Sequence, residues 1–336
     1  MPAGPTLRNF LERTRAARKI IVVDFGFLGD SVHLLPALWE IKRHYAGAEL
    51  HTLSAPVGAE LLAMAPCVDR PWSFPLAAKS PPWWKHWDIL LALRRQRFDA
   101  AFNFTGSDRS LFTTAFIGAP WSLGYAAGRR HLWNGWLVRD WVPRATRELP
   151  VFEQRRQVLA ARGFSLQPAR FDLRVPEAAR QWARQTVPEN VAHLSINAST
   201  PVKEWPLEGW IDLAGALLAS DNDLHLAATG SANPREQERL AALAKGVGNK
   251  RLLCLAAPSL ARLAAILQHS RLHIGGDSGV LHLAMALGTP TLSMVGEHAG
   301  LKEWMPVGER HCQLTAGCLA SISAAQAAVE ALRQLR

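Results

Sequence analysis

The sequence predicts an α/β protein made of two doubly wound units, and three observations support this fold class. Short β-branched apolar runs alternate with segments at helical spacing, which is typical of a parallel sheet covered on both faces. At 336 residues the chain exceeds the usual size of one domain. A proline-rich stretch over residues 165–190 interrupts the alternation, so we expect domains at residues 1–170 and 171–336.

Each predicted element follows from its own pattern, in chain order. The β-branched run KIIVVDF at residues 19–25 predicts a strand, and the apolar spacing after GFLGD predicts a helix over residues 31–45. Strands at 48–55 and 98–104 with following helical segments continue the pattern. In the second half we expect helices at 207–220, 234–247, 259–270 and 278–288, and strands at 191–198, 223–230, 251–256, 271–277 and 289–296.

Two further expectations concern the end of the chain. We expect residues 271–277 and 289–296 to form its last two strands. We also expect the last helix to pack back on the first domain.

Charge is distributed unevenly between the two predicted domains. Residues 1–170 hold 23 Lys and Arg against 13 Asp and Glu, whereas residues 171–336 hold 15 of each. A basic first half attracts anionic partners, which include nucleic acid, a phosphorylated substrate and an anionic membrane surface. The alternative is a basic surface that serves only solubility.

Composition and cysteine usage narrow the class of protein. With 49% hydrophobic and 20% charged residues, the chain has the composition of a folded globular protein. We expect a cytoplasmic location, because the sequence has no run of 18 uncharged apolar residues and the N-terminus lacks the apolar core of a signal peptide. The four cysteines are scattered and predict buried thiols, with neither a zinc site nor disulfides.

The turn after the first predicted strand carries Gly26, Gly29 and Asp30. In open α/β sheets, ligands bind at the loops that follow the carboxyl ends of strands. The glycines allow close approach of a ligand to the backbone. Asp30 has two interpretations, as the N-cap of the following helix or as a base that accepts a proton from a substrate hydroxyl.

A second loop, NASTPVKEWP at residues 197–206, precedes the predicted helix at 207–220. An ammonium from Lys203 can neutralise a diphosphate there, and the hydroxyls of Ser199 and Thr200 can bond its oxygens. The alternative for Lys203 is a solvated loop lysine. We expect Trp205 to pack rather than to stack on a ligand.

A third loop is GGDSGVLHLAMALGTPTLSMVG at residues 275–296. Ser278 and Gly279 begin the predicted helix, where free N–H groups and the helix dipole favour a phosphate. Asp277 either caps that helix or accepts hydrogen bonds from sugar or loop hydroxyls. His282, one turn into the helix, is either a core residue or part of the site.

These three loops occur in an order that resembles glycosyltransferase family 9, the ADP-heptose:lipopolysaccharide heptosyltransferases. The similarity spans nearly the whole chain, and the stretch at residues 275–296 looks like the most specific signature of this family. The resemblance implies a GT-B architecture, in which two Rossmann-like domains face a cleft. The first domain then binds the acceptor and the second domain binds the nucleotide-sugar donor.

Carried over residue by residue, the resemblance assigns roles to the loop residues. Asp30 is then the catalytic base, and Lys203 holds the donor diphosphate. The remaining donor-binding candidates are Ser199, Thr200, Glu236, Asp277, Ser278, Gly279 and His282. The implied reaction is inverting and needs no metal and no cofactor beyond the nucleotide-sugar donor, for which ADP-heptose is expected.

The sequence departs from the family pattern at several positions. Asp24 ends the first strand where the family usually has Arg, and Ile196 and Asn197 replace its usual Pro-Gly. Ser278 replaces the more common Thr and keeps the hydroxyl. Glu236 is a candidate for an acidic donor contact that some members carry.

The basic first half agrees with an anionic lipopolysaccharide-core acceptor. Acceptor-binding candidates are Gly26, Gly29, Lys85, Arg94 and Arg95. The segment at residues 81–98 combines Trp with Lys and Arg, which suits an anionic membrane interface or a lipid-linked acceptor, and aromatic packing with a basic rim is the alternative. We therefore expect peripheral contact with the inner membrane and no nucleic-acid partner, since no nucleic-acid-binding motif is present.

Two alternative functions stay open on sequence grounds. The same fold and mechanism could serve a UDP or GDP sugar, or another acceptor. A non-catalytic nucleotide- or glycan-binding scaffold is a different class, which the presence of Asp30, Lys203 and Asp277 together disfavours.

Overall fold

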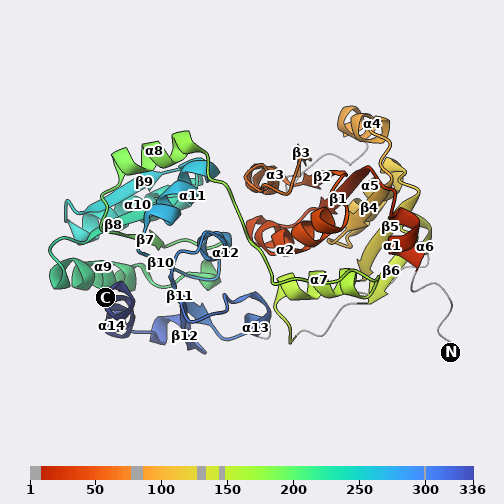
Figure 1. Ribbon diagram of the computed structural model, residues 1–336. Coiled ribbons are helices and arrows are strands. Elements are labelled where there is room, and N and C mark those ends of the chain that lie inside the picture. The colour runs from red at the N-terminus through yellow and green to blue at the C-terminus, as the bar shows by residue number, and fades with distance from the viewer. Residues whose placement is uncertain (1–8, 77–85, 127–133, 144–147, 299) are drawn as a thin grey trace. The chain divides into compact units, whose positions relative to one another are not determined.

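The computed structural model describes residues 9–76, 86–126, 134–143, 148–298 and 300–336, which form two compact units divided between Asp172 and Leu173 (Figure 1). Each unit has one six-stranded sheet in which all the paired strands are parallel. The fold is therefore α/β with two separate parallel sheets.

The first unit has the strand order β3-β2-β1-β4-β5-β6. Its strands are β1 Lys19–Asp24, β2 Glu49–Ser54, β3 Arg70–Ser73, β4 Ala100–Asn103, β5 Trp121–Ala126 and β6 Asp140–Pro143. Its helices are α1 Asn9–Thr14, α2 Leu28–His44, α3 Pro56–Leu62, α4 Trp87–Arg95, α5 Asp108–Ile117, α6 Asn134–Leu137 and α7 Val151–Ala160. The chain reverses its direction across the sheet between β1 and β4, which is the switch point where ligands bind in such folds.

The second unit repeats this topology with the order β9-β8-β7-β10-β11-β12. Its strands are β7 Val191–Ser195, β8 His225–Gly230, β9 Leu252–Ala256, β10 Leu272–Gly275, β11 Thr291–Gly296 and β12 His311–Ala316. Its helices are α8 Glu177–Thr186, α9 Leu207–Ser220, α10 Pro234–Val247, α11 Leu260–His269, α12 Gly279–Ala286, α13 Leu301–Trp304 and α14 Ala324–Leu335, with one-turn 3₁₀ helices η2 Pro201–Lys203 and η3 Leu319–Ser321. Here the switch point lies between β7 and β10.

Apolar residues cover both faces of each sheet. In the second unit, Trp210 and Leu213 of α9 pack with Ala331 of α14 against one face, and α8 and α11 pack together on the other. In the first unit, Leu90 and Leu93 of α4 pack on Ile21 and Val23 of β1. Each unit therefore has a hydrophobic core of its own. Burial of apolar surface contributes about 25 cal/mol per Å² to the free energy of unfolding.

The predicted alternation of strands and helices is confirmed, and the structure adds four strands to the predicted ones, β3, β5, β6 and β12. β12 follows β11, so the expectation that residues 289–296 form the last strand is wrong. β12 was missed because it is a partly exposed edge strand with polar residues. The last helix, α14, packs on α9 of its own unit, where Ala327 and Ala331 are buried, and its packing on the first domain stays a prediction.

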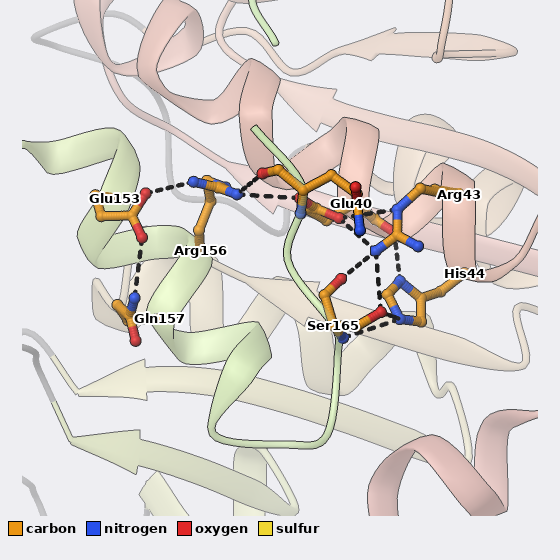
Figure 2. A network of polar contacts seen from close by, with 8 residues as sticks. Glu40, Arg43, His44, Glu153, Arg156, Gln157 and Ser165 are labelled. Atoms are coloured by element: carbon orange, nitrogen blue, oxygen red, sulfur yellow. Dashed lines mark hydrogen bonds and ion pairs between the residues drawn. The ribbon is translucent and has the colours of Figure 1, made fainter. Parts of the chain in front are cut away.

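Helix α7 is fixed to α2 by a buried carboxylate (Figure 2). Glu40 of α2 accepts hydrogen bonds from Arg43 at 2.9 Å and from Arg156 of α7 at 3.2 Å. Arg156 also pairs with Glu153, and Arg43 reaches Ser165 (Figure 2). The network therefore sets the position of α7 along α2.

Candidate active site

The first candidate loop connects β1 to α2. The helix begins at Leu28, with Phe27 as its N-cap, so Asp30 lies in the first turn. The Asp30 Oδ2 atom accepts a hydrogen bond from the Phe27 backbone N–H at 3.0 Å. The interpretation of Asp30 as the N-cap is therefore wrong, because the helix starts two residues earlier and Asp30 bonds back to the cap residue.

A second carboxylate and one guanidinium surround Asp30. Arg155 of α7 places its Nη2 atom 2.9 Å from Asp24 Oδ2 and 3.4 Å from Asp30 Oδ1. Burial raises the pKa of Asp30, Arg155 opposes this rise, and the nearby Asp24 adds to it. A carboxyl group with a raised pKa is a stronger base, which suits it to accept a proton from a hydroxyl.

Gly26 leaves room for the Asp30 side chain. A Cβ atom built on Gly26 would lie 2.2 Å from Asp30 Cβ, so this position has no space for a larger residue. The close approach predicted for the glycines is thus made at Gly26 by Asp30 itself. Gly29 is buried within α2.

The structure does not bring the remaining acceptor candidates to Asp30. Arg94 and Arg95 are in the last turn of α4, which leads into the amino end of β4, whereas Asp30 follows the carboxyl end of the parallel strand β1. Arg94 instead donates a hydrogen bond to the Phe116 carbonyl at 2.6 Å. Lys85 lies outside the described residues.

The second unit brings Lys203 and Asp277 together. The Lys203 Nζ atom lies 2.6 Å from Asp277 Oδ2, and His298 Nε2 lies 3.8 Å from the same oxygen. These three residues line a cavity of about 370 Å³ at the carboxyl ends of β10 and β11, together with Gly296 and Cys318. A cavity of this size suits a nucleotide or another small molecule.

Ser278 is the N-cap of α12, and Gly279 is its first residue, as predicted. The alternative in which Asp277 is the cap is wrong, because the Asp277 carboxylate turns to Lys203 instead. The buried Ser278 hydroxyl makes no hydrogen bond with any residue that the structure describes. A buried hydroxyl beside free helix N–H groups is suited to bond an anionic ligand.

His282 lies inside the second unit. Its ring packs against Trp304 of α13 with the ring centroids 5.8 Å apart, and it is buried. Burial lowers the pKa of His282 to about 4, which Asp277 opposes, so the ring is neutral at neutral pH. His282 is therefore a buried neutral ring close to Asp277 and Lys203, and its part in donor binding stays a prediction.

The other donor candidates lie away from the cavity lining. Ser199 and Thr200 are exposed in the loop before η2. Glu236, in the first turn of α10, accepts a hydrogen bond from the Ser231 backbone N–H at 2.7 Å. Trp205 is buried and its indole N–H bonds the Ile322 carbonyl, which confirms that it packs.

Sequence reasoning missed the residues that hold these groups in place. Glu204 is buried beside Lys203 and binds Arg235 of α10 at 2.7 Å, which fixes the lysine loop to the unit. Arg155 likewise fixes the Asp30 loop from a distant helix. No local sequence pattern marks Glu204 or Arg155, because the residue that each one binds lies in a separate part of the chain. Across the described residues, no group of three His, Cys, Asp or Glu side chains is arranged to hold a metal ion.

This fold, with its functional loops at the two switch points, is that of the GT-B class of glycosyltransferases. A crystal structure of a family 9 glycosyltransferase from Veillonella parvula has a TM-score of 0.81 at 17% identity, covering 95% of this chain and 97% of that one. An Escherichia coli heptosyltransferase WaaC with ADP-2-deoxy-2-fluoro heptose has a TM-score of 0.75 at 22% identity, covering 94% and 99%.

Sequence similarity leads to the family. The model of glycosyltransferase family 9 (heptosyltransferase) matches residues 86–328. Lipopolysaccharide heptosyltransferase 1 of Pseudomonas aeruginosa is 28% identical over 83% of this chain and 78% of its own length. The chain belongs to glycosyltransferase family 9, and the resemblance found in its loops is confirmed.

Proposed function

We propose that this enzyme transfers a heptose from ADP-heptose to a hydroxyl of the lipopolysaccharide inner core, with inversion at the sugar carbon. Family membership and the heptosyltransferase relatives support the type of reaction. The donor is supported by the similarity to WaaC, whose structure was solved with an ADP-heptose analogue.

The observation that carries the proposal is the cavity of the second unit. Lys203 and Asp277 form an ion pair at its wall, and the Ser278 hydroxyl lies at the start of α12 without a partner among the described residues. A diphosphate would attract the Lys203 ammonium and accept hydrogen bonds from Ser278 and from the free N–H groups of α12. Asp277 would then be free to bind a hydroxyl of the donor.

The first unit supplies the base in this proposal. The acceptor hydroxyl oxygen attacks the anomeric carbon, its proton passes to Asp30, and the bond to the diphosphate breaks with its electron pair leaving on ADP. Asp30 is suited to this role because one of its oxygens is held by Phe27 while the side chain remains 27% exposed. Positioning and charge stabilisation would supply most of the rate.

The test measures the donor and the reaction separately. Calorimetric titration with ADP, UDP and GDP identifies the base of the nucleotide, and mass spectrometry of heptose-deficient lipopolysaccharide incubated with ADP-heptose detects the product. We expect preferential ADP binding and a mass gain of one heptose. Preference for UDP or GDP would contradict the donor, and nucleotide binding without transfer to any acceptor would favour the scaffold.

We propose that α4 and α5 also contact an anionic membrane surface. Trp87 and Leu91 lie one turn apart on α4 and are 46% and 40% exposed, and Phe112 of the adjacent α5 is 39% exposed. Arg94 and Arg95 follow on the same helix, which gives apolar and basic groups together. No helix among the described residues is both long and apolar enough to cross a bilayer.

Sedimentation with vesicles tests this surface. We expect binding to vesicles rich in phosphatidylglycerol, and weaker binding for Leu91→Ser and Trp87→Ala. Trp136→Ala is the control, because Trp136 is 91% exposed on α6. Equal loss in all three variants, or none, would contradict the surface. The cytoplasmic location and the absence of a nucleic-acid partner stay predictions.

A further inference from the structure

The group that the proposed reaction leaves unexplained is the buried ion pair beside Asp30. Arg155 comes from α7, more than 120 residues along the chain from Asp30, and its side chain is 6% exposed. The side chain of Asp24, at the end of β1, is 2% exposed. Buried charges are costly unless they are paired, so a buried ion pair beside a third, partly exposed carboxylate needs a reason.

Asp24 is fixed from both sides. Its Oδ1 atom accepts hydrogen bonds from the Gly26 backbone N–H at 2.8 Å and from the Thr105 hydroxyl at 3.2 Å. Thr105 follows β4 and in turn accepts a bond from the Phe25 backbone N–H at 2.7 Å. The Asp24 Oδ2 atom lies 2.9 Å from Arg155 Nη2. Asp24 therefore holds both the loop before α2 and the guanidinium.

Arg155 holds Asp30 in two places. Its Nη1 atom donates to the Asp30 backbone carbonyl, and its Nη2 atom lies 3.4 Å from the carboxylate Oδ1 atom. The other carboxylate oxygen, Oδ2, accepts a hydrogen bond from the Phe27 backbone N–H. The two contacts together restrict the rotation of the Asp30 side chain. A base fixed in this way meets its substrate hydroxyl in one orientation.

We infer that Arg155, anchored by Asp24, is a positioning residue that orients the Asp30 carboxylate and stabilises its ionised form. This inference rests on the proposed role of Asp30 as the base.

The charges around Asp30 predict opposite effects of the two partners. Burial raises the pKa of Asp30, Arg155 lowers it and Asp24 raises it. Of the other titratable groups on α2 and α7, His33 stacks on Phe152 and Glu153 is paired with Arg156. Loss of the Arg155 charge should thus raise the pKa of Asp30, and loss of the Asp24 charge should lower it.

The experiment compares pH profiles of kcat/KM for Arg155→Gln, Arg155→Lys and Asp24→Asn. For Arg155→Gln we expect the acid limb to move to higher pH and kcat to fall about tenfold or more, because the base is no longer held in position. Arg155→Lys keeps the positive charge, so its acid limb should shift less than that of Arg155→Gln. Asp24→Asn should move the limb to lower pH.

A matched control separates positioning from folding. Arg156→Gln removes the neighbouring buried arginine, which binds Glu40 instead, so we expect a lower Tm with the acid limb unchanged. An NMR titration of the Asp30 carboxyl carbon gives the same shifts without activity, which covers variants with poor turnover. Unchanged titration of Asp30 in both Arg155→Gln and Asp24→Asn would overturn the inference. Full activity of Asp30→Asn would instead overturn the proposed function.

Discussion

The two units hold their candidate carboxylates with cations of very different freedom. Asp30 faces Arg155, which is buried, shared with Asp24 and carried on a helix. Asp277 faces Lys203, whose side chain is 43% exposed at the end of a one-turn 3₁₀ helix. A shared and buried guanidinium stays in place and orients its carboxylate. An exposed ammonium can leave its carboxylate for a phosphate, so the first pair suits a fixed base and the second suits a binding site.

The largest effect should come from removing the base. Asp30→Asn keeps the size of the side chain but cannot accept the proton, so we expect kcat to fall about 10²- to 10⁴-fold. Calorimetry should show unchanged ADP binding, since the donor cavity belongs to the second unit. Loss of ADP binding together with turnover would contradict the division of roles between the two units.

The second prediction concerns the ion pair between Lys203 and Asp277. Lys203→Ala should weaken ADP binding roughly 10- to 100-fold, the range expected for losing one charge-assisted hydrogen bond. Lys245→Ala, at an exposed lysine of α10, is the control and should bind ADP normally. If Lys203→Ala bound ADP as the wild type does, the ion pair with Asp277 would be purely structural.

A smaller effect tests how tightly the Asp30 loop is built. Gly26→Ala places a Cβ atom where Asp30 Cβ lies 2.2 Å away, so the side chain must move and kcat should fall about tenfold. Gly47→Ala is matched to it, since a Cβ there meets nothing within 4 Å. Equal activity of the two variants would show that the Asp30 geometry tolerates displacement.

A separate prediction concerns the stability of the second unit in acid. His193 of β7 and His273 of β10 are buried as a pair with their Nδ1 atoms 2.9 Å apart, and burial lowers the pKa of His193 to about 3 and that of His273 well below its ordinary value. Below pH about 6.5 the unfolded chain takes up protons that the folded chain does not. The free energy of unfolding should therefore decrease as the pH falls, by about 1.4 kcal/mol per pH unit for each histidine.

Urea unfolding at several pH values measures this slope. His193→Gln should reduce the slope, whereas His225→Gln, at a partly exposed histidine of the same unit, should leave it unchanged. A stability that does not depend on pH between 6 and 4 would show that the pair binds protons in the folded state.

Most of the fold could be predicted because its main strands and helices carry strong local patterns. The helices at 207–220 and 234–247 match their predicted bounds. The strands β3, β5, β6 and β12 are absent from the prediction. Three of them, β3, β6 and β12, lie at sheet edges, where polar residues and proline are tolerated.

The candidate site could be predicted only where chemistry and sequence position coincide. Asp30, Lys203 and Asp277 each follow a strand, and this placement points to a ligand edge. Arg155 is an ordinary helix residue by sequence, and only the tertiary structure brings it to Asp30. Glu204 is an ordinary loop residue by sequence, and only the tertiary structure pairs it with Arg235. Arg94 and Arg95 show the converse, because their charge suggested an acceptor site that the topology places at the opposite edge of the sheet from Asp30.

The ion pair between Asp24 and Arg155 limits which single substitutions this enzyme can accept. A single change of Asp24 to arginine would set two guanidinium groups face to face in the space where Asp24 now lies 2.9 Å from Arg155. A single change of Arg155 would leave two carboxylates without a cation. Neither position can drift alone, so the lineage that carries this arrangement should inherit both residues together and lose them together.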